Sequence, residues 1–133
     1  ESTEFPILGT NLVEPSFKRE VNKNGPIENI VFFMHSETNN PQNLILENPF
    51  GSRDSREPIV QLTHKLLSLP NNYFDNNGQI IFAICHADSC MDGQAIADSL
   101  DVTVYISPGN VEFIEGISPL VIYGQFNEYK PKN

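Results

Sequence analysis

The stretch QIIFAICH, residues 79–86, decides the fold class of this chain. Its five consecutive apolar residues show no polar alternation, which is typical of a short strand buried on both faces. A second run of this kind, IVFFM at residues 30–34, lies between Asn29 and His35. Strands buried on both faces occur mainly in parallel sheets with helices packed against them, so the two runs favour an α/β protein.

The segments between and after these runs predict the helices and the remaining strands. Apolar residues at three- and four-residue steps predict a helix from Pro58 to about Leu69, closed by Pro70, and a second one from about Asp92 to Leu100. Short strands are expected over residues 43–47 (a candidate edge strand), 102–106, 111–115 and 120–123. We therefore expect a three-layer α/β sandwich whose mainly parallel sheet is flanked by helices.

The N-terminal segment differs in composition from the rest of the chain. Residues 1–27 are polar, contain three prolines and hold three of the eight basic residues, Lys18, Arg19 and Lys23. We expect an arm or linker here, with at most one short strand over Ile7–Val13. Residues 28–133 are then a single domain, because a chain of 133 residues has room for one core. The absence of an initial Met indicates a processed product or an excised piece.

The charge of the chain excludes two classes of partner. Seventeen acidic residues against eight basic ones give a net charge of −9, and no Lys or Arg occurs between Lys65 and Lys130. Proteins that bind nucleic acid or anionic membranes need a face rich in Lys and Arg, so we expect neither partner. No apolar run approaches the ~20 residues of a membrane span, and we expect a soluble protein.

Two reactive side chains follow the two apolar runs directly. His35 ends the first run and Cys85 ends the second, and ligands of open parallel sheets bind at the carboxyl ends of the strands. If the two strands are parallel and close, these side chains face each other across that edge. An imidazole can convert a thiol into the thiolate that attacks a carbonyl carbon, and the helix that begins after Cys85 would direct its positive end there. The predicted chemistry is acyl transfer through a thioester.

The order His then Cys, 50 residues apart and each after an apolar strand, resembles the caspase-like cysteine peptidases of clan CD. Residues 79–88 are similar to the segment of that family in which a hydrophobic strand precedes the cysteine. Residues 93–100 (GQAIADSL) and 102–111 (VTVYISPGNV) resemble the caspase-like domains at the ends of bacterial polymorphic toxins and effectors. The resemblance covers roughly residues 28–126.

This resemblance implies a caspase-like fold and a cysteine endopeptidase that acts on a protein or peptide without a cofactor. Cys85 would be the nucleophile and His35 the general base and acid, and backbone N–H groups at Ser36 and Cys85 would form the oxyanion hole. It also implies a toxin or effector domain that a bacterium secretes or delivers into a target cell.

The charge distribution bears on the substrate such a thiol would accept. Residues 66–129 contain no cation, so a pocket for an Asp side chain would depend on Arg53 or Arg56. A pocket built from the acidic half, with Asp88 as the candidate anchor and His86 on the substrate side, predicts cleavage after basic or neutral residues.

Other interpretations stay open beside the peptidase. The chain could be a catalytically inactive α/β module of the same fold that binds a protein through the loops at the carboxyl edge. Zn²⁺ could be held by Cys85, His86, Asp88 and Cys90 with His35 nearby, but no second Cys/His pair exists and we expect no metal. Cys85 and Cys90 could also form a disulfide that disables the thiolate. No phosphate-binding glycine motif and no serine-hydrolase motif is present.

Overall fold

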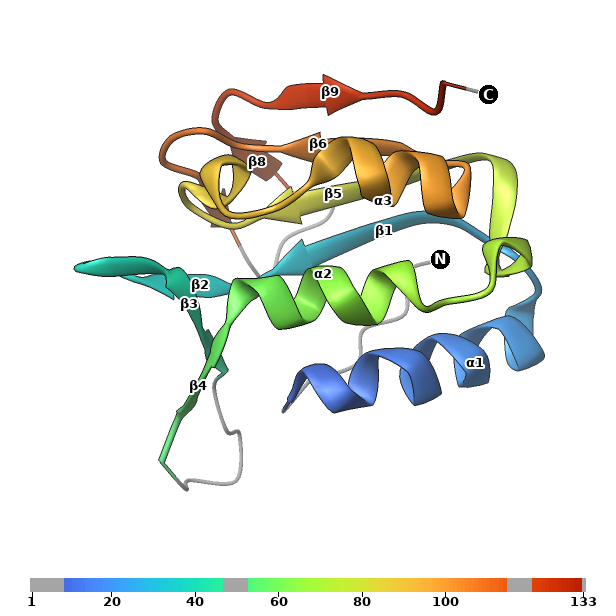
Figure 1. Ribbon diagram of the computed structural model, residues 1–133, viewed down its shortest axis with the longest axis horizontal. Coiled ribbons are helices and arrows are strands. Elements are labelled where there is room, and N and C mark those ends of the chain that lie inside the picture. Colours follow the sequence, from blue (N-terminus) through green and yellow to red (C-terminus); the bar gives the residue numbers. More distant parts are fainter. Residues whose placement is uncertain (1–8, 47–52, 115–120, 133) are drawn as a thin grey trace.

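The computed structural model describes residues 9–46, 53–114 and 121–132, and its centre is a four-stranded sheet, here called sheet A (Figure 1). Its strands, in spatial order, are β1 (Ile27–Phe33), β5 (Phe74–Ala83), β6 (Thr103–Ile106) and β9 (Asn127–Tyr129). β1, β5 and β6 are parallel, and β9 runs antiparallel to β6. The predicted fold class, an α/β sandwich with a mainly parallel sheet flanked by helices, is confirmed.

The remaining elements surround sheet A. Sheet B is antiparallel and continues from the carboxyl end of β1, with β2 (His35–Glu37), β3 (Asn40–Leu46) and β4 (Ser55–Pro58) (Figure 1). β7 (Glu112–Ile114) pairs with β8 (Val121–Tyr123). The helices are α1 (Val13–Asn24), α2 (Ile59–Leu67) and α3 (Gly93–Leu100), and short 3-10 turns occur at η1 (Thr10–Leu12), η2 (Asn71–Tyr73) and η3 (Ala87–Ser89).

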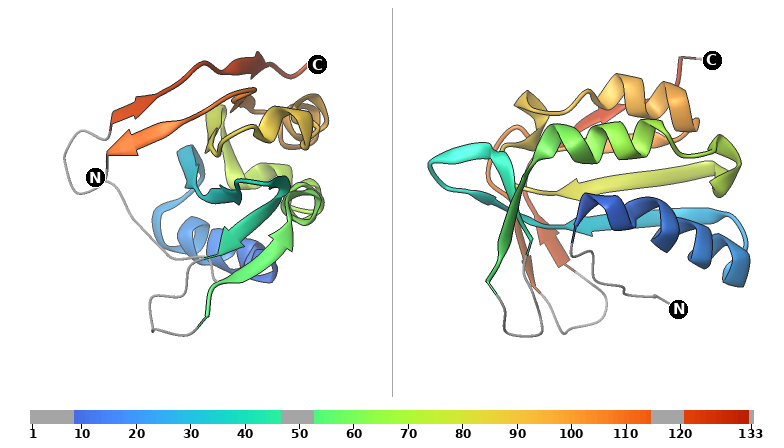
Figure 2. Two further views of the ribbon diagram at one scale, coloured as in Figure 1. Left: turned by 90° about the vertical axis from the view of Figure 1, so that its left-hand side faces the viewer. Right: turned by 60° about the horizontal axis from the view of Figure 1, so that its bottom comes forward.

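The hydrophobic core lies between sheet A and the three α-helices. Figure 2 shows the helices together on one side of the sheet, and α2 contacts both α1 and α3. Every second side chain along the parallel strands faces the helices and is buried. Among these, Phe82 stacks on Phe32 with ring centroids 5.2 Å apart. Side chains of the other parity, such as Ile81 and Tyr105, are half-buried. One face of the sheet therefore carries most of the apolar burial.

Local sequence explains where α2 and α3 begin and end. Pro58 precedes α2 with φ −60°, which suits the residue before the first helical turn. The carboxylate of Asp92 caps α3 by accepting a hydrogen bond from the backbone N–H of Ala95 at 3.0 Å. Asp101 ends α3 in the left-handed conformation at φ 55°, the usual way for a helix to stop. Both predicted helices agree with these bounds to within two residues.

The N-terminal segment is the main correction to the sequence-based expectation. The described part of the expected arm forms η1 and α1 instead of an arm with a strand over Ile7–Val13. Val13 and Phe17 are fully buried in the same core as Phe82. The physical reason is an apolar stripe that the surrounding charges obscure, together with Pro15, which falls in the first helical turn where proline is tolerated. The core therefore begins well before residue 28.

Sheet B also differs from expectation. The strand predicted over residues 43–47 is β3, which begins at Asn40, and Glu47 lies outside the described residues. β3 pairs with β2 on one side and β4 on the other, so it is a central strand and not an edge strand. No strand was predicted at β4, whose last residue, Pro58, was expected to begin the helix. Polar residues dominate β4 because it is largely exposed.

Candidate functional site

His35 and Cys85 occupy equivalent positions at the carboxyl edge of two adjacent parallel strands. Phe33 of β1 pairs with Ala83 of β5, and His35 and Cys85 each follow two residues later. The imidazole of His35 is exposed, while the side chain of Cys85 is half-buried. His35 already belongs to β2, where it pairs with Ile45, so sheet B positions the histidine and sheet A positions the cysteine.

A direct hydrogen bond joins the two segments that carry these residues. The hydroxyl of Ser36 donates to the backbone carbonyl oxygen of Cys85 at 3.2 Å. This contact spans 49 residues of sequence and fixes the start of β2 against the end of β5. The residues predicted to form the oxyanion hole, Ser36 and Cys85, are therefore neighbours in space.

The thiol of Cys85 lies against the backbone of Val111. The N–H of Val111 donates to Sγ at 3.3 Å, and Sγ lies 3.5 Å from the carbonyl oxygen of the same residue. A backbone N–H that points at sulfur makes a stronger hydrogen bond when the sulfur carries negative charge. The carbonyl oxygen of Val111 acts in the opposite sense, because it accepts from the neutral thiol, so the two contacts together fix the position of Sγ.

His86 contacts the loop at residues 107–110 with both its backbone and its ring. The backbone of His86 adopts the left-handed conformation at φ 57°, and its backbone N–H donates to the carbonyl oxygen of Gly109 at 2.8 Å. Nδ1 lies 3.3 Å from the carbonyl oxygen of Pro108. Nε2 lies 3.0 Å from the side-chain amide of Asn110. The ring thus fastens the turn after Cys85 to the loop beside it.

The carboxylate of Asp88 binds the last strand of the sheet. Tyr129 donates its phenolic hydrogen bond to Asp88, and Asn127 Nδ2 donates to the second oxygen at 3.0 Å. The hydrogen bond to Asp88, followed by burial, raises the pKa of Tyr129 above its usual value. These contacts occupy the carboxylate, which disfavours the predicted role of Asp88 as an anchor for a basic substrate side chain.

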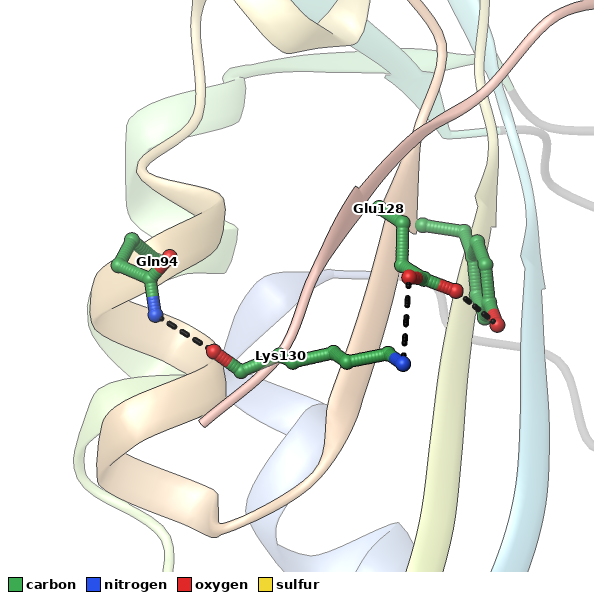
Figure 3. Close-up of polar contacts among 4 residues, drawn as sticks. Gln94, Glu128 and Lys130 are labelled. Carbon is green, nitrogen blue, oxygen red and sulfur yellow. Dashed lines mark hydrogen bonds and ion pairs between the residues drawn. The ribbon is translucent and has the colours of Figure 1, made fainter. Parts of the chain in front are cut away.

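The attachment of β9 was missed by the sequence analysis and involves α3 and β6 as well. Gln94 Nε2 donates to the backbone carbonyl oxygen of Lys130 at 2.8 Å, and the hydroxyl of Tyr105 donates to Glu128 at 2.9 Å (Figure 3). Lys130 Nζ also lies 3.7 Å from Glu128 (Figure 3). β9 has only three residues, and two of them are an amide (Asn127) and a carboxylate (Glu128). Such a segment has no apolar periodicity, so the sequence does not mark β9 as a strand.

A shallow cavity of about 330 Å³ lies beside the cysteine turn, and its lining residues are Pro108, Gly109, Asn110, Gly124 and Gln125. A larger cavity of about 550 Å³ runs along α1 and contains none of the predicted site residues. We consider the smaller cavity the relevant one, because three of its lining residues, Pro108, Gly109 and Asn110, contact His86. Asn110 also directly precedes Val111, whose backbone contacts Sγ of Cys85.

Two further results concern metals and membranes. Within the described ranges, no group of three or more His, Cys, Asp or Glu side chains is placed to hold a metal ion, and Cys85 and Cys90 are free thiols. None of the helices in the described part of the chain is long and apolar enough to cross a membrane.

Comparison with known proteins does not assign the chain to a family. No protein-family model, no curated protein and no solved structure matches it.

Proposed function

We propose that this chain is a cysteine endopeptidase-like effector domain that uses His35 and Cys85 as a catalytic pair. The observation that carries the proposal is their equivalent placement, two residues beyond a register pair of adjacent parallel strands. Loops converge at the carboxyl edge of such sheets, which is where ligands bind. The resemblance of residues 93–111 to toxin-associated domains supports delivery from a bacterium as part of the same proposal.

The reaction follows from the chemistry of the two side chains. The Cys85 thiolate attacks the scissile carbonyl carbon, and the developing oxyanion accepts hydrogen bonds from backbone N–H groups at Ser36 and Cys85. His35 then protonates the leaving amine as the C–N bond breaks, which leaves a thioester on Cys85. His35 next deprotonates a water that attacks this thioester and releases the carboxylic acid and the free thiol.

One observation favours a second candidate function. Sγ of Cys85 contacts both the N–H and the carbonyl group of Val111, as a structural cysteine does when its side chain fastens a loop. On this alternative the chain is a catalytically inactive module that binds a protein partner through the loops at the carboxyl edge of sheet A.

Thiol labelling separates the two functions. With iodoacetamide at neutral pH and mass spectrometry as the readout, the peptidase proposal expects Cys85 to react faster than Cys90. His35→Ala is expected to slow the reaction of Cys85. His64→Ala is the matched control, because His64 is an exposed histidine on α2, away from the segments that carry His35 and Cys85. Equal, slow labelling of both cysteines in all three proteins would favour the binding module.

Peptide cleavage provides the second readout. The wild-type chain is expected to cleave an unstructured peptide mixture, and Cys85→Ala is expected to abolish that cleavage. Cys90→Ala is the matched control, because Cys90 is a half-buried thiol outside the proposed pair. Cleavage that survives Cys85→Ala would refute the proposal.

A further inference from the structure

We propose that the cavity lined by Pro108, Gly109, Asn110, Gly124 and Gln125 is the recognition pocket for an uncharged, hydrogen-bonding side chain of the substrate, such as a carboxamide. The accepted side chain belongs to the residue whose carbonyl group Cys85 attacks. This inference rests on the proposed function, because it assigns that site its substrate class.

The position of the cavity supports this assignment. Asn110 precedes Val111, whose backbone contacts Sγ of Cys85 on both its N–H and its carbonyl group. His86 follows Cys85, and its ring reaches Pro108 and Asn110 on the cavity wall. The nucleophile and the cavity therefore share one connected set of residues. We therefore infer that a peptide whose carbonyl carbon is next to Sγ directs a side chain toward this wall.

The chemistry of the lining determines the class of side chain. None of the five lining residues carries a charge, so the wall offers no opposite charge to a Lys, Arg, Asp or Glu side chain. Asn110 and Gln125 present amide groups that both donate and accept hydrogen bonds. Both side chains are exposed, so they can exchange hydrogen bonds with water for hydrogen bonds with a polar uncharged side chain of the substrate. The absence of Lys and Arg from residues 66–129 further disfavours an acidic side chain.

Gly109 offers a way to fill the cavity without disturbing the fold. A Cβ added at Gly109 meets no atom within 4 Å, and the φ of this residue lies outside the left-handed region. Gly124 is less suitable, because its φ is 152° and an added Cβ would lie 3.0 Å from the carbonyl oxygen of Asn110. Gly109→Ala and Gly109→Leu therefore add side chains of two sizes at the cavity wall with little strain.

Peptides that differ only at the residue before the scissile bond test the pocket by catalysis. We expect kcat/KM to be about tenfold or more higher for Asn and Gln than for Lys, Asp and Leu at that position. Gly109→Leu is expected to lower kcat/KM for the Asn and Gln peptides about tenfold, and Gly109→Ala less, while the rate of Cys85 labelling by iodoacetamide stays unchanged. Val60→Ala, at an exposed position on α2, is the control substitution. A wild-type preference for the Lys or Asp peptide, or unchanged selectivity in Gly109→Leu, would contradict the proposed pocket. Neither result would contradict the proposed peptidase function, because both require cleavage.

A binding measurement separates the pocket from the chemistry. N-acetylasparagine amide is titrated into the Cys85→Ser chain, with N-acetyllysine amide as the comparison, and the backbone amide NMR shifts of Gly109, Asn110 and Gly124 are followed. Saturable shifts with the asparagine compound alone support the pocket, even where the wild type cleaves no peptide and the proposed function fails. No saturable shift at these residues, or equal shifts with the two compounds, overturns the pocket.

Discussion

The phenol of Tyr129 donates a hydrogen bond to the carboxylate of Asp88, which precedes it by 41 residues. Asp88 lies in the turn that follows Cys85, and Tyr129 lies in β9, the last strand of sheet A. This contact makes the shape of the cysteine turn depend on a strand near the end of the chain. The first three predictions below concern this contact and its surroundings.

Removing the phenolic hydroxyl is expected to weaken the attachment of β9. Tyr129→Phe deletes one of two donors to Asp88 and should lower the free energy of unfolding by about 1 kcal/mol, as for a typical hydrogen bond. Urea denaturation at pH 7 measures the change. Tyr105→Phe is the matched control, because its hydroxyl donates to the exposed Glu128 and should matter less. A larger loss in Tyr105→Phe than in Tyr129→Phe would contradict the prediction.

Alkaline pH is expected to reduce the contribution of Tyr129. The hydrogen bond to Asp88 raises the pKa of Tyr129 above the value of about 10 that it has in an unfolded chain. The native state therefore holds the proton more tightly, so this contribution is complete below pH 10 and is lost as pH rises through the native pKa. The difference in unfolding free energy between wild type and Tyr129→Phe should shrink above pH 10 in urea titrations. A difference that grows there would show that the sign is wrong.

A methyl group at Gly93 is expected to displace β9. A Cβ at Gly93 would lie 2.5 Å from Cδ2 of Tyr129 and 2.9 Å from Cδ1 of Ile106, too close for either contact to persist. Overpacking of this kind typically costs about 1–3 kcal/mol, against a gain of up to about 1 kcal/mol from the better helix propensity of Ala. We expect a net loss of stability for Gly93→Ala by urea denaturation. Gly109→Ala, which adds a methyl group in open space, is the control and should leave stability nearly unchanged.

Truncation of Phe17 tests whether α1 belongs to the core. Phe17 is fully buried and stacks on Phe32 with ring centroids 6.0 Å apart. Phe17→Ala should lower the free energy of unfolding by about 3–5 kcal/mol, as for other large-to-small changes in cores. Val60→Ala, at a site 46% exposed on α2, should change it by less than about 0.5 kcal/mol. A small effect at Phe17 would instead indicate an arm that packs loosely.

The apolar patterns of the sequence predicted the elements at the centre of the fold. They did not predict α1 and β9, which lie near the two ends of the chain. β5, α2, β6 and α3 carry uninterrupted or amphipathic apolar patterns, and the last three lie within two residues of their expected ranges. β5 contains the predicted apolar run but begins at Phe74, six residues before it. α1 was missed because charged residues interrupt its apolar stripe. β9 was missed because its stability comes from side-chain contacts with residues about 40 positions earlier, and local sequence does not encode such contacts.

In the candidate site too, local sequence predicted some features, and others depend on contacts between residues far apart in the sequence. The strand pattern predicted that His35 and Cys85 lie at one edge if their strands are parallel and close, and β1 and β5 are adjacent parallel strands. The contact between Cys85 and Val111 and the capture of Asp88 by Tyr129 depend on how the later loop and the last strand fold back. The proposed recognition pocket therefore could not be inferred without the tertiary structure.

The parallel register of β1 with β5 also has a kinetic consequence. Each pair from Asn29 with Gln79 to Phe33 with Ala83 is separated by 50 residues, so the chain must close a long loop before any of these contacts forms. The hydrogen bonds within helices α2 and α3 join residues only four positions apart, so these helices can form earlier. His35 and Cys85 can meet only after β1 docks on β5. The two residues of the candidate pair are therefore expected to come together only when this long-range pairing forms, after contacts that close shorter loops.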